Sequence, residues 1–412
     1  MAAIQSSTEK PSGIPWLIII AGSLIAVMTF GPRSAMGLFQ LPLLQDKGWD
    51  RTTFSMAIAL QNLFWGIGQP FFGAIADKYG TWRVLLMSAI LYASGLVLMA
   101  WSTTPGMLYI GGGLLVGLGI ASGSFGTILS AFARNVSAEK RTFVFGIGTA
   151  AGSAGMFVFS PVSLELIEHY GWSDALVYLG IAMAIVPLLA IPLRGNSSSG
   201  RISEAQYKQS MGEALREALG HRSYVLLTTG FFVCGFQLAF ITAHFPAYLN
   251  DIGIDAKYAV LALALIGFFN VIGSLASGVI SQRYSKPKFL AYLYIGRSVL
   301  VAAFLLLPQT GASVVVFAIV MGLMWLSTVP PTNALVAIMF GTRYLAMLGG
   351  IVFFSHQVGS FLGVWLGGYL YDHLGSYNPV WWLSVVLGIL AAIVHWPIEE
   401  RQADRPALQP AE

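Results

Sequence analysis

The sequence predicts an all-α polytopic membrane protein with twelve transmembrane helices in two pseudo-symmetric bundles of six. Its composition, a series of long apolar segments and an internal repeat carry this prediction. Of the 412 residues, 56% are hydrophobic and only 10% are charged, against about 25% charged in a typical soluble domain. The mean hydropathy of +0.72 points the same way.

Twelve apolar segments are long enough to cross a bilayer, which takes about 20 helical residues. They cover residues 16–44, 52–76, 82–102, 106–132, 142–165, 173–193, 223–249, 257–281, 288–307, 312–339, 344–370 and 379–397. We therefore expect a first bundle, a linker with a short amphipathic helix between Glu204 and Leu219, and a second bundle. The predicted boundaries are tail 1–15, bundle 16–194, linker 195–222, bundle 223–397 and tail 398–412.

Basic residues are distributed unevenly between the two sides of the predicted helices. With both termini in the cytoplasm, the outer loops hold only Lys47, Arg51 and Lys257, while Arg33 and Arg297 lie within spans. The other 17 of the 22 Lys and Arg residues fall in cytoplasmic segments. The positive-inside rule therefore predicts cytoplasmic termini, and we expect the protein in the plasma membrane, which is the inner membrane of a bacterium.

A compact charged motif connects the second and third segments. Residues 73–83 read Gly-Ala-Ile-Ala-Asp-Lys-Tyr-Gly-Thr-Trp-Arg. Gly73 is expected to let neighbouring helices approach closely, and Gly80 tolerates the positive φ of a tight turn. Two glycines and a tyrosine of this region recur with the same spacing 205 residues later, where Gly68, Gly73 and Tyr79 correspond to Gly273, Gly278 and Tyr284.

This motif, its degenerate repeat and the twelve segments together resemble the major facilitator superfamily over the whole chain. The resemblance implies two six-helix bundles that rock around a binding site near the membrane midplane. It also implies a cytoplasmic gate, in which Asp77 pairs near Arg134 or with an adjacent helix N-terminus. Gly73, Gly80 and Arg83 are the other residues of the gating motif.

Ionisable side chains within the membrane are the first candidates for binding, because each costs about 2.5–3.5 kcal/mol on insertion scales. All 18 acidic residues lie at span ends, in loops or in the termini. The charged side chains in the middle of spans are Arg33 and Arg297, and His244 and His356 are the imidazoles expected to be buried. A cavity with cations and no fixed anion has a positive potential, which favours an anionic substrate.

Arg33 follows Pro32 in the first segment. A proline interrupts the helical hydrogen-bond ladder and frees backbone carbonyls, as in many substrate-binding helices. The segment Phe30–Ser34 resembles the aromatic-Pro-Lys-Ser sequence of monocarboxylate transporters, in which the cation faces the substrate pathway. The resemblance implies that Arg33 binds a carboxylate, with a bidentate fork that lysine lacks. An arginine that extends to the outer interface is the alternative.

His356 lies near the centre of the eleventh segment. Its imidazole can bind substrate or carry a proton near neutral pH, and the oxalate–formate antiporter branch is similar here, with a lysine near this place. A histidine hydrogen-bonded between helices is the alternative. Gln357 faces a different side of the helix, so at most one of the two points directly at the substrate.

The other candidates are less specific. Arg297 lies in the ninth segment, which in the resembling family usually packs outside the cavity. A structural role, with donation to backbone carbonyls or to Asn270, is therefore as good an interpretation as substrate binding. His244 is an outer-gate or substrate candidate, or a solvated interfacial histidine. A polar and aromatic lining could be completed by Gln61, Asn62, Gln237, Asn270, Trp325, Thr328 and Asn333.

The resemblance to monocarboxylate transporters also runs through residues 141–180, but it departs in the eighth segment. Asn270 and Ser274 stand where that family has an aspartate and an arginine. The usual proton acceptor and the principal carboxylate-binding arginine are therefore absent at this place. Arg33, Arg297 and His356 would have to substitute for them.

Several function classes lack their sequence signatures. The chain has no Walker loop, no metal-spaced Cys/His cluster and no nucleophile elbow, so we expect no enzyme activity, cofactor or metal. Cys234 is the single cysteine, which excludes an intramolecular disulfide. The net charge of +4 is distributed over short loops, so we expect no nucleic-acid partner.

The sequence therefore predicts a monomeric secondary transporter in the lipid bilayer. Its expected substrate is a small organic anion, with monocarboxylates favoured, moved by proton symport or by exchange for another anion. One alternative is an exporter of amphipathic or aromatic organic compounds. Another is a non-transporting membrane sensor or scaffold, for which the linker 195–222 leaves little room for an output domain.

The gate assignment generates a test. Asp77→Asn removes the charge and keeps the shape, so we expect it to lower the initial rate of transport more than it lowers expression. The rate per molecule of purified protein in liposomes measures this effect. Unchanged transport kinetics would exclude a role for Asp77 in the gate.

Overall fold

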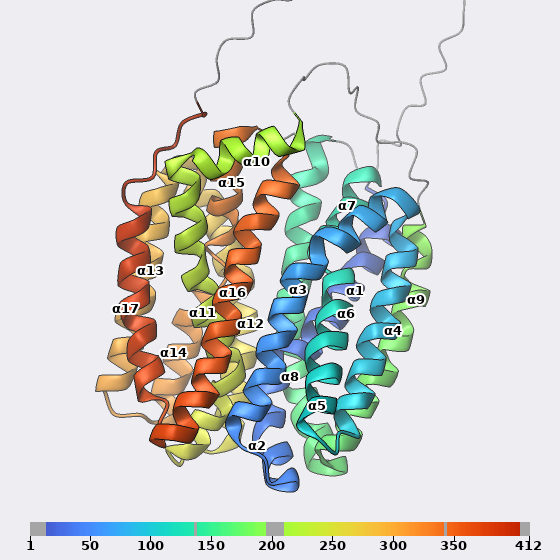
Figure 1. Cartoon of the computed structure of the whole chain (residues 1–412), viewed down its shortest axis with the longest axis vertical. Coiled ribbons are helices and arrows are strands. Elements are labelled where there is room, and N and C mark those ends of the chain that lie inside the picture. Colours follow the sequence, from blue (N-terminus) through green and yellow to red (C-terminus); the bar gives the residue numbers. More distant parts are fainter. Residues whose placement is uncertain (1–13, 136–137, 195–209, 342–343, 404–412) are drawn as a thin grey trace, which may run out of the picture.

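The computed structural model describes residues 14–135, 138–194, 210–341 and 344–403, which are almost entirely helical. Long helices run side by side in two bundles, formed by the N-terminal half in blue to green and the C-terminal half in yellow-green to red (Figure 1). Ten stretches of the described residues are long and apolar enough to span a membrane. The predicted fold class is confirmed.

The N-terminal bundle begins with a span that is broken into α1 and α2. Its helices are α1 (Trp16–Ser34), α2 (Met36–Lys47), α3 (Arg51–Tyr79), α4 (Thr81–Ala100), α5 (Pro105–Leu108), the π-helix η1 (Tyr109–Leu115), α6 (Val116–Ser122), α7 (Phe125–Asn135), α8 (Ala138–Ala182), the 3-10 turn η2 (Met183–Ile185), α9 (Val186–Leu189) and the 3-10 turn η3 (Ile191–Leu193).

The C-terminal bundle is preceded by a short helix, α10 (Met211–Gly220), and contains one broken span, α14 with α15. Its other helices are longer. They are α11 (Arg222–Asp251), α12 (Ala256–Arg283), α13 (Lys286–Leu306), α14 (Gly311–Met324), α15 (Val329–Phe340), α16 (Leu345–Leu374) and α17 (Asn378–His395).

Each predicted segment coincides with a helical stretch, and two features explain why only ten spans stand out by hydropathy. α8 joins two predicted spans through Gly171, whose φ of +80° breaks the helical geometry. α3 is 29 residues long but carries amides such as Gln61 and Asn62, so it is less apolar. The breaks within 106–132 and 312–339 were not predicted.

The predicted amphipathic helix of the linker is present in its described part as α10. Ser210 begins it with a capping box, in which the Ser210 N–H donates to Glu213 over 2.6 Å. These Ser210 hydrogen bonds lower the pKa of the exposed Glu213 carboxyl. Ala214 and Ala218 face inward, and Ala218 belongs to the core of the C-terminal bundle. Residues 195–209 of the predicted linker lie outside the described part of the chain.

Two hydrophobic cores correspond to the two bundles. The first is built around side chains such as Ile25, Tyr92 and Phe132, and the second around Phe245 and Trp381. A few residues cross over: Ala239, Ala243 and Val364 join the first core, and Met156 joins the second. The halves therefore pack against each other through α11, α16 and α8.

Arg33 lies beside the break in the first span, near the middle of that span. Pro32 lies within the last turn of α1, and the chain turns at Ala35 before α2 begins. At 1.5 Å per residue, Arg33 is about 26 Å from the start of α1 and about 21 Å from the end of α2. The predicted interruption at Pro32 therefore occurs within one turn of the expected place.

Glycines allow α11 and α16 to pack with almost no space between their backbones. A Cβ atom at Gly359 would stand 2.0 Å from the Phe232 carbonyl oxygen, and one at Gly235 would stand 1.8 Å from the His356 carbonyl oxygen. Real side chains do not reach such distances, so any substituent would force the two helices apart.

We expect Gly359→Ala to destabilise the folded protein by about 1–3 kcal/mol, the usual cost of overpacking. Gly350→Ala, in the same helix, is the matched control, because no described atom lies within 4 Å of a Cβ at that position. Thermal unfolding in detergent should therefore separate the two variants. Equal melting temperatures would contradict the close approach of α11 and α16.

Candidate functional site

Arg33 lies at the interface between the two bundles, on the N-terminal side. Its Nη2 donates to Asn62 Oδ1 over 2.7 Å, and its guanidinium carbon is 4.7 Å from the centre of the Trp65 ring. Arg33 also lines a cavity of about 10 Å³, the space for one water molecule. Residues of both bundles line this cavity: Met36, Ile58, Gln61 and Asn62 from the first, and Ala239, Thr242 and Ala243 from the second.

No described carboxylate pairs with Arg33. The ion pairs of the described residues lie at helix ends or in the loops beside them, as in Lys286–Glu400 and Arg401–Glu399. Arg33 Nε is buried and has no hydrogen-bond partner among the described residues. Arg33 is therefore a cation at membrane depth that has no anionic partner among the described residues, and only some of its N–H donors have acceptors there.

The two amides beside Arg33 differ in role. Asn62 accepts from Arg33 and donates to the Ile58 carbonyl over 2.8 Å. Gln61 donates to the Gly112 carbonyl over 2.9 Å and so joins α3 to η1. Asn62 orients the guanidinium, whereas Gln61 lines the cavity while it holds two helices together.

A row of aromatic rings connects Arg33 to His356 in the other bundle. The ring of Trp65 lies 5.1 Å from Phe353, and Phe353 stacks on His356 at 5.7 Å with an interplanar angle of 8°. Phe30 and Phe231 extend this row at its two ends, at 5.7 Å from Trp65 and 5.1 Å from His356. The structure thus brings Arg33 and His356 to the two ends of one apolar row.

The imidazole of His356 is almost fully buried, at 8% exposure. Its Nδ1 lies 3.2 Å from Gln357 Oε1 and 3.5 Å from Ser360 Oγ. These polar neighbours come from its own helix, α16. The ring packs against Phe231 of α11 and Phe353 of α16, which both belong to the C-terminal bundle.

Arg297 is fully buried inside the C-terminal bundle, where it completes the broken span. Its Nη2 donates to the carbonyl oxygens of Met324 and Trp325 at the end of α14, and its Nη1 contacts Cys234 Sγ at 3.4 Å. Of the two alternatives for Arg297, the geometry matches donation to backbone carbonyls. Cys234, which sequence reasoning did not select, also contacts Thr328 Oγ1 at 3.3 Å.

Asn270 supports the same break from α12. Its Oδ1 accepts from the backbone N–H of Leu326 over 2.9 Å, and its Nδ2 donates to Ser153 Oγ over 2.8 Å. Ser153 belongs to α8, so this amide also links the two bundles. Asn270 and Arg297 both serve the irregular backbone around Trp325, but they do not contact each other directly in any described hydrogen bond.

Two of the predicted lining residues lie away from Arg33. Gln237 donates to the Ser384 carbonyl over 3.0 Å, which places its amide between α11 and α17 inside the C-terminal bundle. Asn333 is exposed on α15, and its Oδ1 lies 3.6 Å from where a Cβ of Gly349 would be. The structure does not bring either side chain to the aromatic row.

His244 is fully enclosed near one end of the bundles. Its Nε2 contacts the Val364 carbonyl at 2.8 Å, and its Nδ1 lies 3.2 Å from the Tyr377 hydroxyl and 3.5 Å from Gln40 Nε2. Gln40 comes from α2, so His244 takes part in the contact between the bundles. It is not a solvated interfacial histidine.

A network centred on Arg51 closes this end, and sequence reasoning missed it. Arg51 begins α3 and forms a two-pronged ion pair with Asp251 of the other bundle, with N–O distances of 2.6 and 2.7 Å. Its Nη1 also donates to the Tyr377 hydroxyl over 2.9 Å, and its guanidinium lies 3.6 Å from the centre of the Tyr371 ring. Asp372 accepts from the backbone N–H groups of Arg51 and Thr52.

We call Arg51, Asp251, Tyr371, Asp372 and Tyr377 the Arg51 network, and the end of the molecule that holds it the Arg51 end. The opposite end, which carries α10, is called the linker end (Figure 1). Helices also meet closely at the Arg51 end, where a Cβ at Gly368 would stand 2.6 Å from the Arg51 carbonyl oxygen. The two bundles are therefore clamped together at this end.

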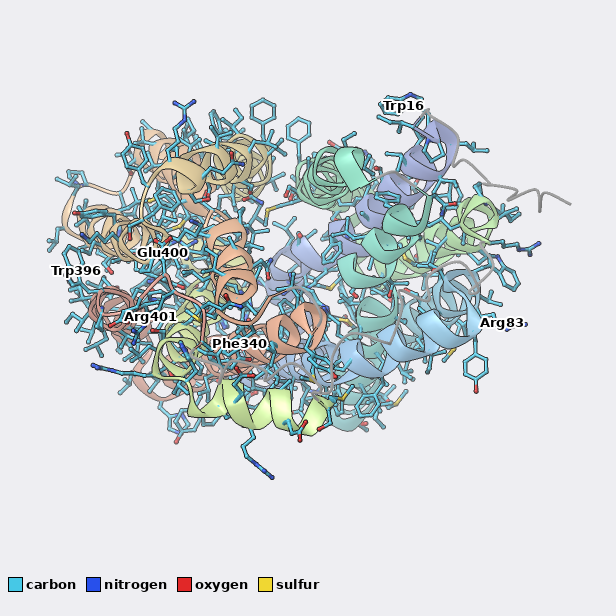
Figure 2. The ribbon with its side chains drawn as sticks, turned by 90° about the horizontal axis from the view of Figure 1, so that it is seen from above. Trp16, Arg83, Phe340, Trp396, Glu400 and Arg401 are labelled. Atoms are coloured by element: carbon cyan, nitrogen blue, oxygen red, sulfur yellow. The ribbon has the colours of Figure 1, made fainter. Side chains whose placement is uncertain are left out.

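The predicted gating motif lies at the linker end, and only part of it can be compared. Gly80 has a φ of +93° between α3 and α4, as its place in a tight turn requires. The expectation for Gly73 is wrong in this structure, because no described atom lies within 4 Å of a Cβ there. Arg83 donates to the Tyr79 carbonyl over 2.9 Å and points outward from its bundle (Figure 2). The side chains of Asp77 and Arg134 lie outside the described part.

Within the described residues, no group of three or more His, Cys, Asp or Glu side chains is arranged to hold a metal ion. The chemistry available at the bundle interface is therefore that of a guanidinium, amide and indole donors, an imidazole and aromatic faces. These groups suit reversible binding of an organic molecule with an anionic part.

The structure is that of a multi-pass membrane protein with two helical bundles. Between the bundles lies an arginine whose charge has no described anionic partner. These features define the class of two-bundle transporters. The model of the Major Facilitator Superfamily matches residues 19–364. The chain belongs to this superfamily. It is a secondary transporter, not an enzyme, as the sequence predicted.

Similar proteins include transporters of bacteria and animals. An uncharacterized MFS-type transporter of Bacillus subtilis, YcxA, is 25% identical over 92% of this chain and 94% of its own length. Monocarboxylate transporter 13 of Rattus norvegicus is 25% identical over 94% of this chain and 91% of its own length.

Two solved structures share the fold. A D-xylose-proton symporter superposes with a TM-score of 0.72 at 15% identity and covers 94% of this chain and 99% of its own. A bacterial homolog of the human lysosomal transporter Spinster, in an inward-facing and unoccupied conformation, has a TM-score of 0.72 at 13% identity, over 93% of this chain and 97% of its own. At these identities the likeness concerns the fold alone.

The Arg51 network predicts a measurable coupling between the bundles. Arg51 and Asp251 side chains are only 11% and 23% exposed, so we expect a double-mutant cycle with Arg51→Ala and Asp251→Ala to give a coupling energy of about 1–3 kcal/mol. Denaturant titration in detergent micelles of the wild type, both single variants and the double variant measures it.

The pair Lys257–Asp255 is the control for this cycle, because its side chains are 67% and 57% exposed. An exposed pair of this kind contributes about 0–1 kcal/mol. Additive effects of Arg51→Ala and Asp251→Ala would show that the two bundles are not coupled through this ion pair.

Proposed function

We propose that the protein transports a small organic anion, with monocarboxylates as the favoured class, and that Arg33 neutralises the carboxylate. One observation carries the proposal: Arg33 lies at the bundle interface, near the middle of its span, and no described carboxylate pairs with it. A guanidinium with free donors matches the planar geometry of a carboxylate. The monocarboxylate transporters among the similar proteins support this class.

The aromatic row supports a substrate with an apolar body. Trp65 and Phe353 lie between Arg33 and His356, so an anion held by the guanidinium would place its carbon skeleton against their rings. The same row favours the second candidate function, export of an amphipathic or aromatic compound. A strict dependence on a carboxylate group distinguishes the first candidate from the second.

The transport cycle that we propose is alternating access with the linker end and both termini in the cytoplasm. In this orientation the Arg51 network is the outer gate, and the structure represents a state closed to the outside. His244 belongs to the outer gate through its contact with Tyr377.

His356 is the proposed group that hydrogen-bonds the substrate or carries a proton. Arg297 and Asn270 are proposed to hold the broken span α14–α15 rather than to bind substrate, because Arg297 Nη2 and Asn270 Oδ1 already bond to its backbone. One experiment distinguishes proton symport from anion exchange. Acidification of a weakly buffered liposome lumen during substrate entry indicates symport, and strict dependence on an internal anion indicates exchange.

The proposal predicts that Arg33→Gln removes binding of carboxylates. Loss of the charged, bidentate contact should cost about 2–4 kcal/mol, or roughly 30- to 1,000-fold in affinity. Arg33→Lys keeps the charge and loses the fork, so we expect an intermediate affinity. Thermal stabilisation of the purified protein by a panel of carboxylates, amino acids, sugars and cationic drugs measures these changes.

Arg216→Gln is the matched control, because Arg216 is exposed on α10 at the linker end and belongs neither to the gating motif nor to the Arg33 site. It should leave the affinity for carboxylates unchanged. Stabilisation of the wild type only by cations or neutral sugars would exclude an anionic substrate.

A further inference from the structure

Gln357 and Trp65 carry buried hydrogen-bond donors that have no partner among the described residues. Trp65 lies under the Arg33 guanidinium, and Gln357 lies against Gly66, the residue after Trp65. We propose that these two residues bind the substrate together with Arg33, and that all three donate to the oxygen atoms of a carboxylate-bearing molecule across the bundle interface. This inference rests on the proposed function, because it takes the Arg33 site to be the substrate site. It adds two binding residues and limits the ligand to one that presents several oxygen acceptors.

The first observation is the bonding of the Gln357 amide. The side chain is fully buried, at 0% exposure. Its Oε1 lies 3.2 Å from His356 Nδ1 and 3.2 Å from Ser360 Oγ. Its Nε2 has no partner among the described residues. One end of the amide is thus fixed by its own helix, while the other end is left to donate elsewhere.

The second observation is the indole of Trp65. The side chain is 7% exposed, and its Nε1 also has no partner among the described residues. Buried polar groups in folded proteins are hydrogen-bonded in the great majority of cases, so an unpartnered one requires an explanation. The Nε atom of Arg33 is a third unpartnered donor.

The third observation is that these donors come together from both bundles. Arg33 lies over the Trp65 ring at 4.7 Å, and Trp65 contacts Phe353, one turn before Gln357 in α16. Gly66, the residue after Trp65, lies against Gln357, whose Cβ would be only 2.8 Å from a Cβ at Gly66. Gln357, rather than His356, therefore faces the N-terminal bundle.

The chemistry of these donors defines the ligand. Guanidinium and indole N–H groups and an amide NH₂ can only donate, so the complementary ligand must accept several hydrogen bonds. A carboxylate has two oxygens with about four acceptor positions, which suits this set. An ammonium compound or an alkane has no such acceptors. Because Gln357 belongs to one bundle and Arg33 to the other, the ligand would hold the two halves together.

Two residues away from Arg33 provide controls, one with an unpartnered donor and one whose donor is satisfied. Trp381 Nε1 is buried and unpartnered inside the C-terminal bundle, away from Arg33. Gln237 has the same side chain as Gln357 and is 1% exposed, but its Nε2 donates to Ser384. Substitutions at these positions remove similar atoms without touching the proposed site.

The test measures the affinity of the purified, full-length protein for lactate, pyruvate, butyrate, benzoate and phenylacetate by thermal stabilisation. The probe that binds the wild type most tightly is then titrated against variants. Gln357→Met and Trp65→Phe remove the donors and nearly keep the volumes, so we expect at least a tenfold weaker affinity for each. Gln237→Met and Trp381→Phe should remain within twofold of the wild type.

A second substitution keeps the test decisive where Gln357→Met does not fold. Gln357→Glu has the same shape but replaces the donor with a negative charge, so it should weaken binding of the anion at least tenfold. Wild-type affinity in Gln357→Glu, or in both Gln357→Met and Trp65→Phe, would overturn the inference. The proposed function would stand in that case if Arg33→Gln still abolished binding. No stabilisation of the wild type by any of the five probes would overturn both.

Discussion

A hydrocarbon environment offers no hydrogen bonds, so every interruption of a helix at membrane depth has to be satisfied by the protein itself. The C-terminal bundle meets this constraint at the break between α14 and α15. The guanidinium of Arg297 donates to the freed carbonyls of Met324 and Trp325, and Asn270 accepts from the N–H of Leu326. The hydrogen bonds to the interrupted backbone therefore explain why Arg297 lies within a span.

The same constraint leads to a different interpretation of Arg33. Arg33 also lies next to a helix interruption, but its Nη2 donates to the Asn62 side chain and its guanidinium lies over Trp65, so its described side-chain contacts do not serve the interrupted backbone. A cation that is left partly unsatisfied at membrane depth costs free energy, which a bound anion would offset. The two arginines thus divide into one that supports the fold and one that is available for a ligand.

Closure of the molecule at the Arg51 end depends on groups at the ends of helices, where water can reach them when the bundles separate. Arg51, Asp251 and Asp372 are charged residues that would be well hydrated in an open state. A clamp of this kind can form and break at modest cost, whereas a buried ion pair in the hydrocarbon region could not. This difference supports the proposal that the switching contacts lie at the end of the spans and the binding contacts at their centre.

The sequence by itself determined the helical membrane fold, the two halves and the central position of Arg33 in its span, because hydropathy and proline act locally along the chain. It left open which polar side chains meet. Whether Arg297 faces a cavity or a backbone carbonyl, and whether Gln357 or His356 faces the other bundle, depends on how α13, α14 and α16 pack. The Arg51 network joins residues 200 and 321 positions apart, and only the tertiary structure brings such groups within hydrogen-bonding distance.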